Sequence, residues 1–166
     1  MTVNYANRGK QFEGLLDYTN QIYANKGIAL INKRPTPVQI LRTRGNRITN
    51  AIYTKKSTVD YDGIYKGKPI TFEAKSTNGK SLPLSMIPQH QVDYLLDAIV
   101  HGAIAFFIVH FKELDKTYKI SALLVDRYIK AAENGGRKSI PIKEFEDSGI
   151  EVHSKDGIPL DYLKEL

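Results

Sequence analysis

A short pattern of acidic and basic residues between Asp60 and Lys75 constrains this chain more than any other stretch. The segment is predicted to form two strands joined by a turn at Lys66-Gly67-Lys68, with Asp60 on the first strand and Glu73 and Lys75 at the end of the second. Side chains alternate between the two faces of a strand, so Glu73 and Lys75 share a face, and the turn can bring Asp60 beside them.

Two carboxylates and an ammonium at one sheet edge suggest a metal site. Neighbouring carboxylates repel each other unless a positive charge lies between them, and a hard divalent cation bound by oxygens can supply that charge. A lysine beside such an ion can hold an attacking water or stabilise a pentacovalent phosphorane. The spacing of Asp60, Glu73 and Lys75 is the pattern of metal-dependent nucleases of the PD-(D/E)XK class, although Val59 replaces its proline. The alternative is a solvent-facing hairpin on which Lys and Glu alternate by chance.

The distribution of charge indicates a polyanionic partner. The chain has 24 Lys and Arg against 18 Asp and Glu, and no acidic residue occurs between Tyr18 and Val59. That acid-free stretch carries eight basic residues, namely Lys26, Lys33, Arg34, Arg42, Arg44, Arg47, Lys55 and Lys56. A one-sided positive field leading up to Asp60 is typical of a nucleic-acid-binding surface, and the alternative is a solvated basic surface without a partner.

Length and composition limit the architecture. The 166 residues fit one nuclease domain, 1–166, with a sizeable core. The absence of cysteine excludes disulfides, thiolate metal sites and cysteine nucleophiles. No apolar run is long enough to span a bilayer, and the first residues do not resemble a signal peptide, so we expect a cytoplasmic protein without a membrane partner.

The segment at about 42–56 is predicted to leave the core. Pro35 and Pro37 exclude a helix or a sheet interior just before it, and the segment itself is basic with few large apolar residues. We expect a projecting loop or ribbon between two core strands, with Ile48, Ile52 and Tyr53 as its own small apolar contacts. Such an excursion can enter a DNA groove or the opening of a junction; the alternative is a basic loop without a role.

The remaining pattern predicts one mixed α/β sheet flanked by helices. Helices are expected at 8–25, 89–100 and 126–134, and further strands at 27–33, 103–111 and 117–124, while 142–166 gives little signal. The first helix is predicted to bury a stripe made of Phe12, Leu15, Leu16, Thr19, Ile22 and Tyr23. Glu13 lies at the edge of this stripe, where a carboxylate can face a site or simply be exposed. A second small basic cluster occupies 137–140.

Several segments closely resemble the RecU family of Holliday-junction resolvases, in the same order along the chain. They are Asn7-Arg8-Gly9, Phe12-Glu13, the stretches 32–40 and 57–68, Phe72-Glu73-Ala74-Lys75, His90-Gln91 and the stretch 134–140. Val59 stands where the family often has Thr, Asp62 stands where Asn is usual, and the longer N-terminal extension of many members is absent.

The resemblance implies a restriction-endonuclease-like fold and a homodimeric, Mg²⁺-dependent endonuclease, with Mn²⁺ able to substitute, that cuts four-way DNA junctions symmetrically. It implies that Asp60, Glu73, Thr58 and Gln91 are metal ligands and that Lys75 stabilises the transition state. The segment 42–56 corresponds to the family's protruding stalk. Expected DNA contacts are Arg8, Arg34, Arg42, Arg44, Arg47, Lys55 and Lys56, with Glu13 as a second-tier site residue. The alternatives are a non-catalytic junction-binding module and a nuclease of the same fold that cuts duplex DNA.

Overall fold

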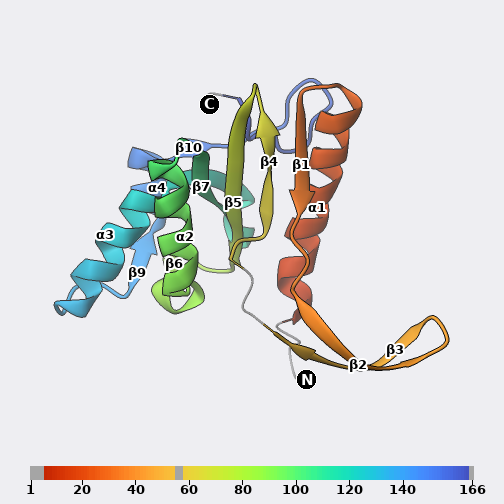
Figure 1. Cartoon of the computed structure of the whole chain (residues 1–166). Helices are drawn as coiled ribbons and strands as arrows, with labels where there is room; N and C mark the ends of the chain where they lie inside the picture. The colour runs from red at the N-terminus through yellow and green to blue at the C-terminus, as the bar shows by residue number, and fades with distance from the viewer. Residues whose placement is uncertain (1–5, 55–57, 165–166) are drawn as a thin grey trace.

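A computed structural model describes residues 6–54 and 58–164, with side chains from Lys10 onward (Figure 1). The helices are α1 (Ala6–Asn25), α2 (Gln89–Val100), α3 (Ala122–Glu133) and α4 (Ile142–Ser148). The strands are β1 (Ala29–Lys33), β2 (Val38–Arg44), β3 (Arg47–Tyr53), β4 (Tyr61–Tyr65), β5 (Lys68–Thr77), β6 (Ser81–Pro83), β7 (Ile104–Phe111), β8 (Lys116–Ser121), β9 (Ser139–Pro141) and β10 (Ile150–Glu151). Short 3-10 helices occupy Leu84–Met86 and Lys112–Leu114. None of the described helices is long and apolar enough to cross a membrane.

One mixed sheet organises the molecule. Its six strands follow the order β1-β4-β5-β7-β8-β10, and of these neighbours only β5 and β7 run parallel. One apolar cluster packs α1 and the C-terminal segment against one face, through residues such as Phe12, Phe72 and Tyr162. The other packs α2, α3 and α4 against the opposite face, through residues such as Leu95, Val125 and Phe145. The predicted mixed α/β sheet flanked by helices is confirmed.

The central hairpin forms as predicted, with a small shift at each end. Lys66 and Gly67 form a two-residue turn in which both φ angles are positive, 48° and 75°. This is the conformation that matches the twist of the flanking strands, and glycine adopts it without strain. Lys68 therefore begins β5 instead of belonging to the turn, and Asp60 lies one residue before β4 instead of on it.

The first helix buries a narrower stripe than predicted. Phe12, Leu16, Thr19 and Tyr23 are buried, whereas Leu15 is 39% exposed. These four positions are spaced by three or four residues and therefore lie on a single helix face, with Leu15 at its margin.

The C-terminal third differs most from the prediction. The strand expected at 117–124 ends at Ser121, and α3 begins at Ala122, four residues before the predicted helix. The reason is an N-cap, because the Ser121 side chain accepts a hydrogen bond from the Leu123 N–H (3.2 Å) and satisfies one free donor of the helix. The segment after Ile142, which gave little signal, contributes α4, β10 and a buried Tyr162.

A separate two-stranded ribbon, β2 and β3, projects from the sheet between β1 and β4 (Figure 1). It begins at Val38, four residues before the predicted start of the excursion, and every residue on both strands is exposed. Its base is tied by backbone hydrogen bonds from Arg34 to Asp60 (2.7 Å) and from Thr54 to Pro37 (3.2 Å). The expected apolar contacts of Ile48, Ile52 and Tyr53 with one another stay a prediction; these side chains are 55%, 49% and 79% exposed, because a lone ribbon has no third layer to cover them.

Candidate active site

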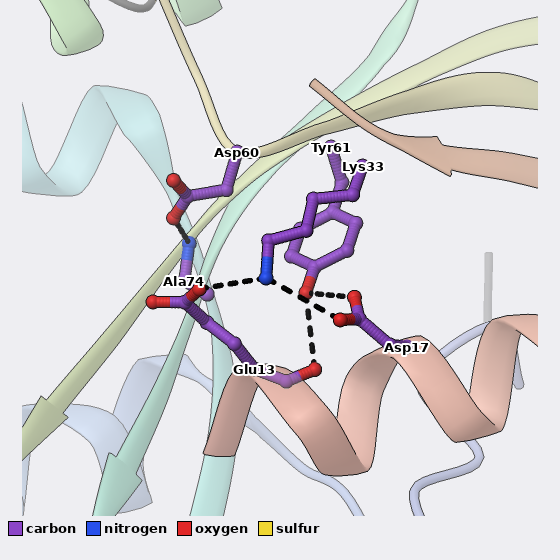
Figure 2. Close-up of polar contacts among 6 residues, drawn as sticks. All are labelled: Glu13, Asp17, Lys33, Asp60, Tyr61 and Ala74. Carbon is purple, nitrogen blue, oxygen red and sulfur yellow. Dashed lines mark hydrogen bonds and ion pairs between the residues drawn. The ribbon is translucent and has the colours of Figure 1, made fainter. Parts of the chain in front are cut away.

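Asp60 is held against the central strand by the backbone. Its Oδ2 accepts a hydrogen bond from the Ala74 N–H at 3.0 Å, so a residue just before β4 is fixed beside the C-terminal half of β5 (Figure 2). The carboxylate thus lies next to Glu73 and Lys75, which flank Ala74 in sequence. The structure brings together the three residues that the sequence pattern proposed as catalytic.

Glu73, Lys75 and Gln91 form a closed hydrogen-bonded triangle. Lys75 Nζ donates to Glu73 Oε1 (2.7 Å) and to Gln91 Oε1 (2.9 Å), and Gln91 Nε2 donates to the same Glu73 oxygen (2.7 Å). Glu73 is 2% exposed and Gln91 is 8% exposed. Gln91 belongs to the first turn of α2, so the helix packed against the sheet delivers it to the end of β5. Gln91 therefore reaches the cluster, although its proposed role as a metal ligand stays a prediction.

Burial raises the proton affinity of both carboxyl groups. Burial raises the pKa of Glu73 to about 7; the negative charge of Asp60 adds to this, and the Lys75 ammonium opposes it. Burial also raises the pKa of Asp60, an effect that the Ala74 N–H and Lys75 oppose and that the charge of Glu13 strengthens. Without a further cation, the pair therefore holds a proton more tightly than free carboxylates do.

Glu13 approaches Asp60 from α1, at the edge of a second cluster of charges (Figure 2). Its carboxylate pairs with Lys33 Nζ at 2.8 Å, and the same ammonium contacts Asp17 at 3.3 Å. The Tyr61 hydroxyl donates to Asp17 (2.6 Å) and to the Glu13 carbonyl (3.2 Å).

Sequence reasoning missed Lys33, Asp17 and Tyr61 as neighbours of the site. Strand alternation could have indicated the position of Lys33. Ile31 is buried, so Lys33, two residues later on β1, points to the same α1-covered face.

Thr58 and Arg34 belong to a separate cluster of polar side chains, near the start of β4. Arg34 donates to the Thr58 hydroxyl and to the Tyr94 hydroxyl (2.9 Å), and its Nε pairs with Asp62 at 3.1 Å. The guanidinium also stacks over the Tyr94 ring, with 5.1 Å to the ring centroid. Arg34 is thus engaged inside the protein, and its proposed DNA contact stays a prediction, as does the proposed ligand role of Thr58.

The other predicted DNA contacts divide into two groups. Arg42, Arg44 and Arg47 lie exposed on the ribbon and form no ion pair among the residues that the structure describes. The side chain of Arg8 and the whole of Lys55 and Lys56 lie outside the described part of the chain.

One atom of the cluster indicates that a cation fits there. Glu73 Oε2 is buried and has no hydrogen-bond partner among the described residues. A buried carboxylate oxygen without a donor is costly, and a metal ion satisfies it. Across 6–54 and 58–164, no three His, Cys, Asp or Glu side chains gather closely enough to hold an ion by themselves. A bound ion would therefore also use hydroxyl, amide or water oxygens, which Mg²⁺ accepts.

A mixed sheet with two carboxylates and a lysine gathered at one strand end has the chemistry of a phosphate-cleaving enzyme. Comparison with known proteins identifies the family. The sequence matches RecU, recombination protein U, over residues 7–166, and the chain belongs to this family. The resemblance inferred from the motifs is thereby confirmed.

Similar proteins cover nearly the whole chain. The Holliday junction resolvase RecU of Geobacillus kaustophilus is 43% identical over an alignment of 169 positions, which covers 98% of this chain and 82% of that protein. The proteins of the same name from Pediococcus pentosaceus and Lactococcus lactis are each 37% identical; the matches cover 98% of this chain and 84% and 78% of those proteins.

Proposed function

We propose that this chain is a Holliday junction resolvase, an endonuclease that hydrolyses phosphodiester bonds in four-way DNA junctions. Family membership supports this assignment, and the observation that carries the chemistry is the cluster of Asp60, Lys75 and the buried Glu73. The proposal includes a restriction-endonuclease-like fold, dependence on Mg²⁺ with Mn²⁺ able to replace it, a homodimer that matches the twofold symmetry of the junction, and action on DNA in the cytoplasm.

In this proposal, Asp60 and Glu73 are the principal metal ligands, with Thr58 and Gln91 as further oxygen donors and Glu13 as a second-tier carboxylate. When bound, a divalent ion supplies Lewis acidity and neutralises charge at the scissile phosphate. Asp60 is already oriented by the Ala74 N–H, and Glu73 by Lys75 and Gln91, so little side-chain ordering is needed on binding.

Lys75 has the position to act on the phosphate. Its side chain is 13% exposed and its ammonium is held between Glu73 and Gln91, so the ammonium is fixed in place while part of the side chain stays accessible to solvent. Hydrolysis adds negative charge to the phosphate oxygens in the transition state, and a preoriented ammonium stabilises that charge more than it stabilises the ground state. Gln91 acts as the group that keeps the lysine oriented.

The ribbon corresponds in this proposal to the family's basic stalk and enters the junction. Its arginines, Arg42, Arg44 and Arg47, are exposed and form no ion pair in the described structure, which leaves them available to DNA phosphates. Arg8, Arg34, Lys55 and Lys56 complete the proposed contacts with the DNA backbone. Such contacts supply affinity and register without reading sequence.

Separating cleavage from binding tests this assignment. Asp60→Asn and Glu73→Gln remove a charge with little change in shape, so we expect loss of junction cleavage by at least about 1,000-fold with junction affinity in EDTA retained. Asp147→Asn, the same kind of change on the surface of α4, is the matched control and should keep wild-type cleavage. Cleavage of a labelled junction by either site variant at the wild-type rate in Mg²⁺ would refute the site.

The two alternatives lead to different results. A non-catalytic junction-binding module has no use for a buried carboxyl group held beside a second carboxyl group, so Glu73, with its raised pKa and its position next to Asp60, argues against it. A duplex nuclease of the same fold would use the same cluster, and only substrate preference distinguishes it.

A further inference from the structure

Two loops on the side of the site opposite the ribbon carry exposed cations. Lys80 lies in the turn between β5 and β6, and Arg137 and Lys138 lie in the loop between α3 and β9. All three residues are exposed. We call Lys80, Arg137 and Lys138 the distal basic patch.

The small β6–β9 sheet joins these loops. Ser81 pairs with Pro141, Leu82 with Ile140 and Pro83 with Ser139. Backbone hydrogen bonds continue past both ends of the pairing, from Ile142 N–H to the Lys80 carbonyl (3.0 Å) and from Leu84 N–H to the Lys138 carbonyl (3.1 Å). Leu82 and Ile140 are fully buried and anchor the pair in the core. The loops therefore have a fixed position relative to each other.

The loop after α3 is also fixed by its own backbone. Gly135 has a φ of 84°, and the Gly136 N–H bonds the Ala131 carbonyl at 2.8 Å, which ends the helix. A side chain at Gly136 would place its Cβ 2.6 Å from that carbonyl oxygen. The two glycines thus turn the chain sharply and present Arg137 and Lys138 to solvent.

The pairing of charges distinguishes this patch from the adjacent helices α3 and α4. Every Lys and Arg on α3 and α4 contacts a carboxylate, since Arg127 pairs with Glu144, Lys130 with Asp126 and Lys143 with Asp147. Between these helices, Arg137 and Lys138 form no ion pair within the described residues, and neither does Lys80. Arg137 donates only to the Ser139 hydroxyl, at 3.2 Å. Cations left unpaired beside helices whose cations are all paired are available to an external anion.

The patch lies within reach of the DNA held at the site. Lys80 follows Lys75 by five residues, so their Cα atoms are at most about 18 Å apart, or about five nucleotide steps along a duplex strand. The ribbon and the β6–β9 sheet lie on opposite sides of the strand ends that carry the site (Figure 1). DNA that contacts the ribbon and passes the site continues toward the patch.

We propose that the distal basic patch binds the phosphate backbone of the duplex arm leaving the active site, so that the scissile strand is held from both sides. This inference rests on the proposed function, because it takes its DNA path from the proposed site. The ligand is the DNA backbone itself, with no preference for base sequence.

Salt dependence of binding provides the test. The triple variant Lys80→Gln, Arg137→Gln, Lys138→Gln is compared with the control Arg127→Gln, Lys130→Gln, Lys143→Gln, which removes equal charge from the adjacent helices. Junction binding is titrated in EDTA at several salt concentrations. Because the patch variant can no longer neutralise three phosphates, we expect its slope of log K against log salt to fall by about 2 to 3 in magnitude and that of the control to stay at the wild-type value.

Hydroxyl-radical footprinting locates the phosphates that the patch covers. We expect the patch variant to lose protection about three to five nucleotides from the cleavage position and to keep the protection given by the ribbon. An unchanged slope and footprint would overturn the proposed patch while leaving the resolvase assignment intact. A wild-type protein that does not cleave junctions would overturn the proposed function, and the slopes would still decide whether the patch contacts DNA.

Discussion

Protonation of Glu73 should change both the stability of the fold and the binding of a metal ion. Its pKa is raised from 4.5 to about 7 in the fold, chiefly by burial. A carboxyl group with a raised folded-state pKa gives full stability below its unfolded pKa, and this contribution is lost as pH rises through about 7. In EDTA, Glu73→Gln should therefore be more stable than wild type at pH 8, by up to about 3 kcal/mol, with the difference vanishing below about pH 4.5.

Urea unfolding of both proteins at pH 4.5, 6, 7 and 8 measures this difference. Adding Mg²⁺ at pH 8 should stabilise the wild type and leave Glu73→Gln unchanged, because a ligand that binds only the folded state raises its stability. A Glu73→Gln variant less stable than wild type at pH 8 in EDTA would show that the fold favours the ionised carboxylate, and so that the pKa of Glu73 is not raised.

A substitution at Gln91 tests whether Lys75 must be held in a fixed orientation for cleavage. Gln91→Ala removes one acceptor from Lys75 and one donor from Glu73. We expect junction cleavage to fall by about 10- to 100-fold, the usual effect of losing a group that orients a site, while junction affinity in EDTA stays unchanged. Single-turnover cleavage with saturating enzyme isolates the chemical step. A normal cleavage rate in this variant would leave Gln91 with a packing role only.

At the scale of elements, the ribbon carries charge at the expense of stability. Arg44 and Arg47 face each other across the turn, and like charges in a cross-strand pair are destabilising. The double variant Arg44→Gln, Arg47→Gln should weaken junction binding and reduce the preference for junction over duplex, without lowering thermal stability. Lys66→Gln, Lys68→Gln, at the other hairpin turn, removes equal charge as a control. Competition binding with junction and matched duplex gives the preference; an unchanged value contradicts a junction-entering ribbon.

Gly63 is required for β1 to pair with β4. A Cβ at this position would lie 2.0 Å from the Leu30 carbonyl oxygen, on backbone that cannot move without separating the two strands. Gly63→Ala should destabilise the fold by about 2 kcal/mol or more. Lys33, which pairs with Glu13, is the last residue of β1. A variant that displaces β1 should therefore also disturb the contacts of Glu13. Urea unfolding measures the loss, and Gly14→Ala, on α1 with open space around its Cα, is the tolerated control.

Elements that depend on a local sequence pattern were predicted correctly. Bounds and contacts that depend on a single side chain or on the tertiary structure were not. The stripe of α2 and the apolar run of β7 are strong periodic signals, and both elements lie within one residue of their predicted bounds. The start of α3 depends on the Ser121 cap, which overrides the strand pattern that continues to Leu124. Strand alternation predicted one part of the hydrogen-bonded triangle around Lys75, because it places Glu73 and Lys75 on the same face. The contacts of Arg34 with Asp62 and Tyr94 join three separate elements, which no local pattern reveals.

At the scale of the whole molecule, the parts proposed to meet DNA gather at one end. The base of the ribbon, the start of β4 and the β6–β9 sheet lie toward the same end, and the β4–β5 turn lies at the other (Figure 1). Asp60 and Glu73 therefore lie between two basic elements, the ribbon and the distal basic patch. In the proposed homodimer, two such surfaces would address the two strands that a symmetric junction presents for cleavage.

Cleavage of matched substrates tests the central claim most directly. A labelled four-way junction and a linear duplex of the same sequence are each incubated with the wild-type protein, in Mg²⁺ and in EDTA. We predict paired, symmetric cuts in the junction in Mg²⁺ only, with the duplex left intact. Equal cleavage of the duplex, or cleavage in EDTA, would contradict a metal-dependent junction resolvase.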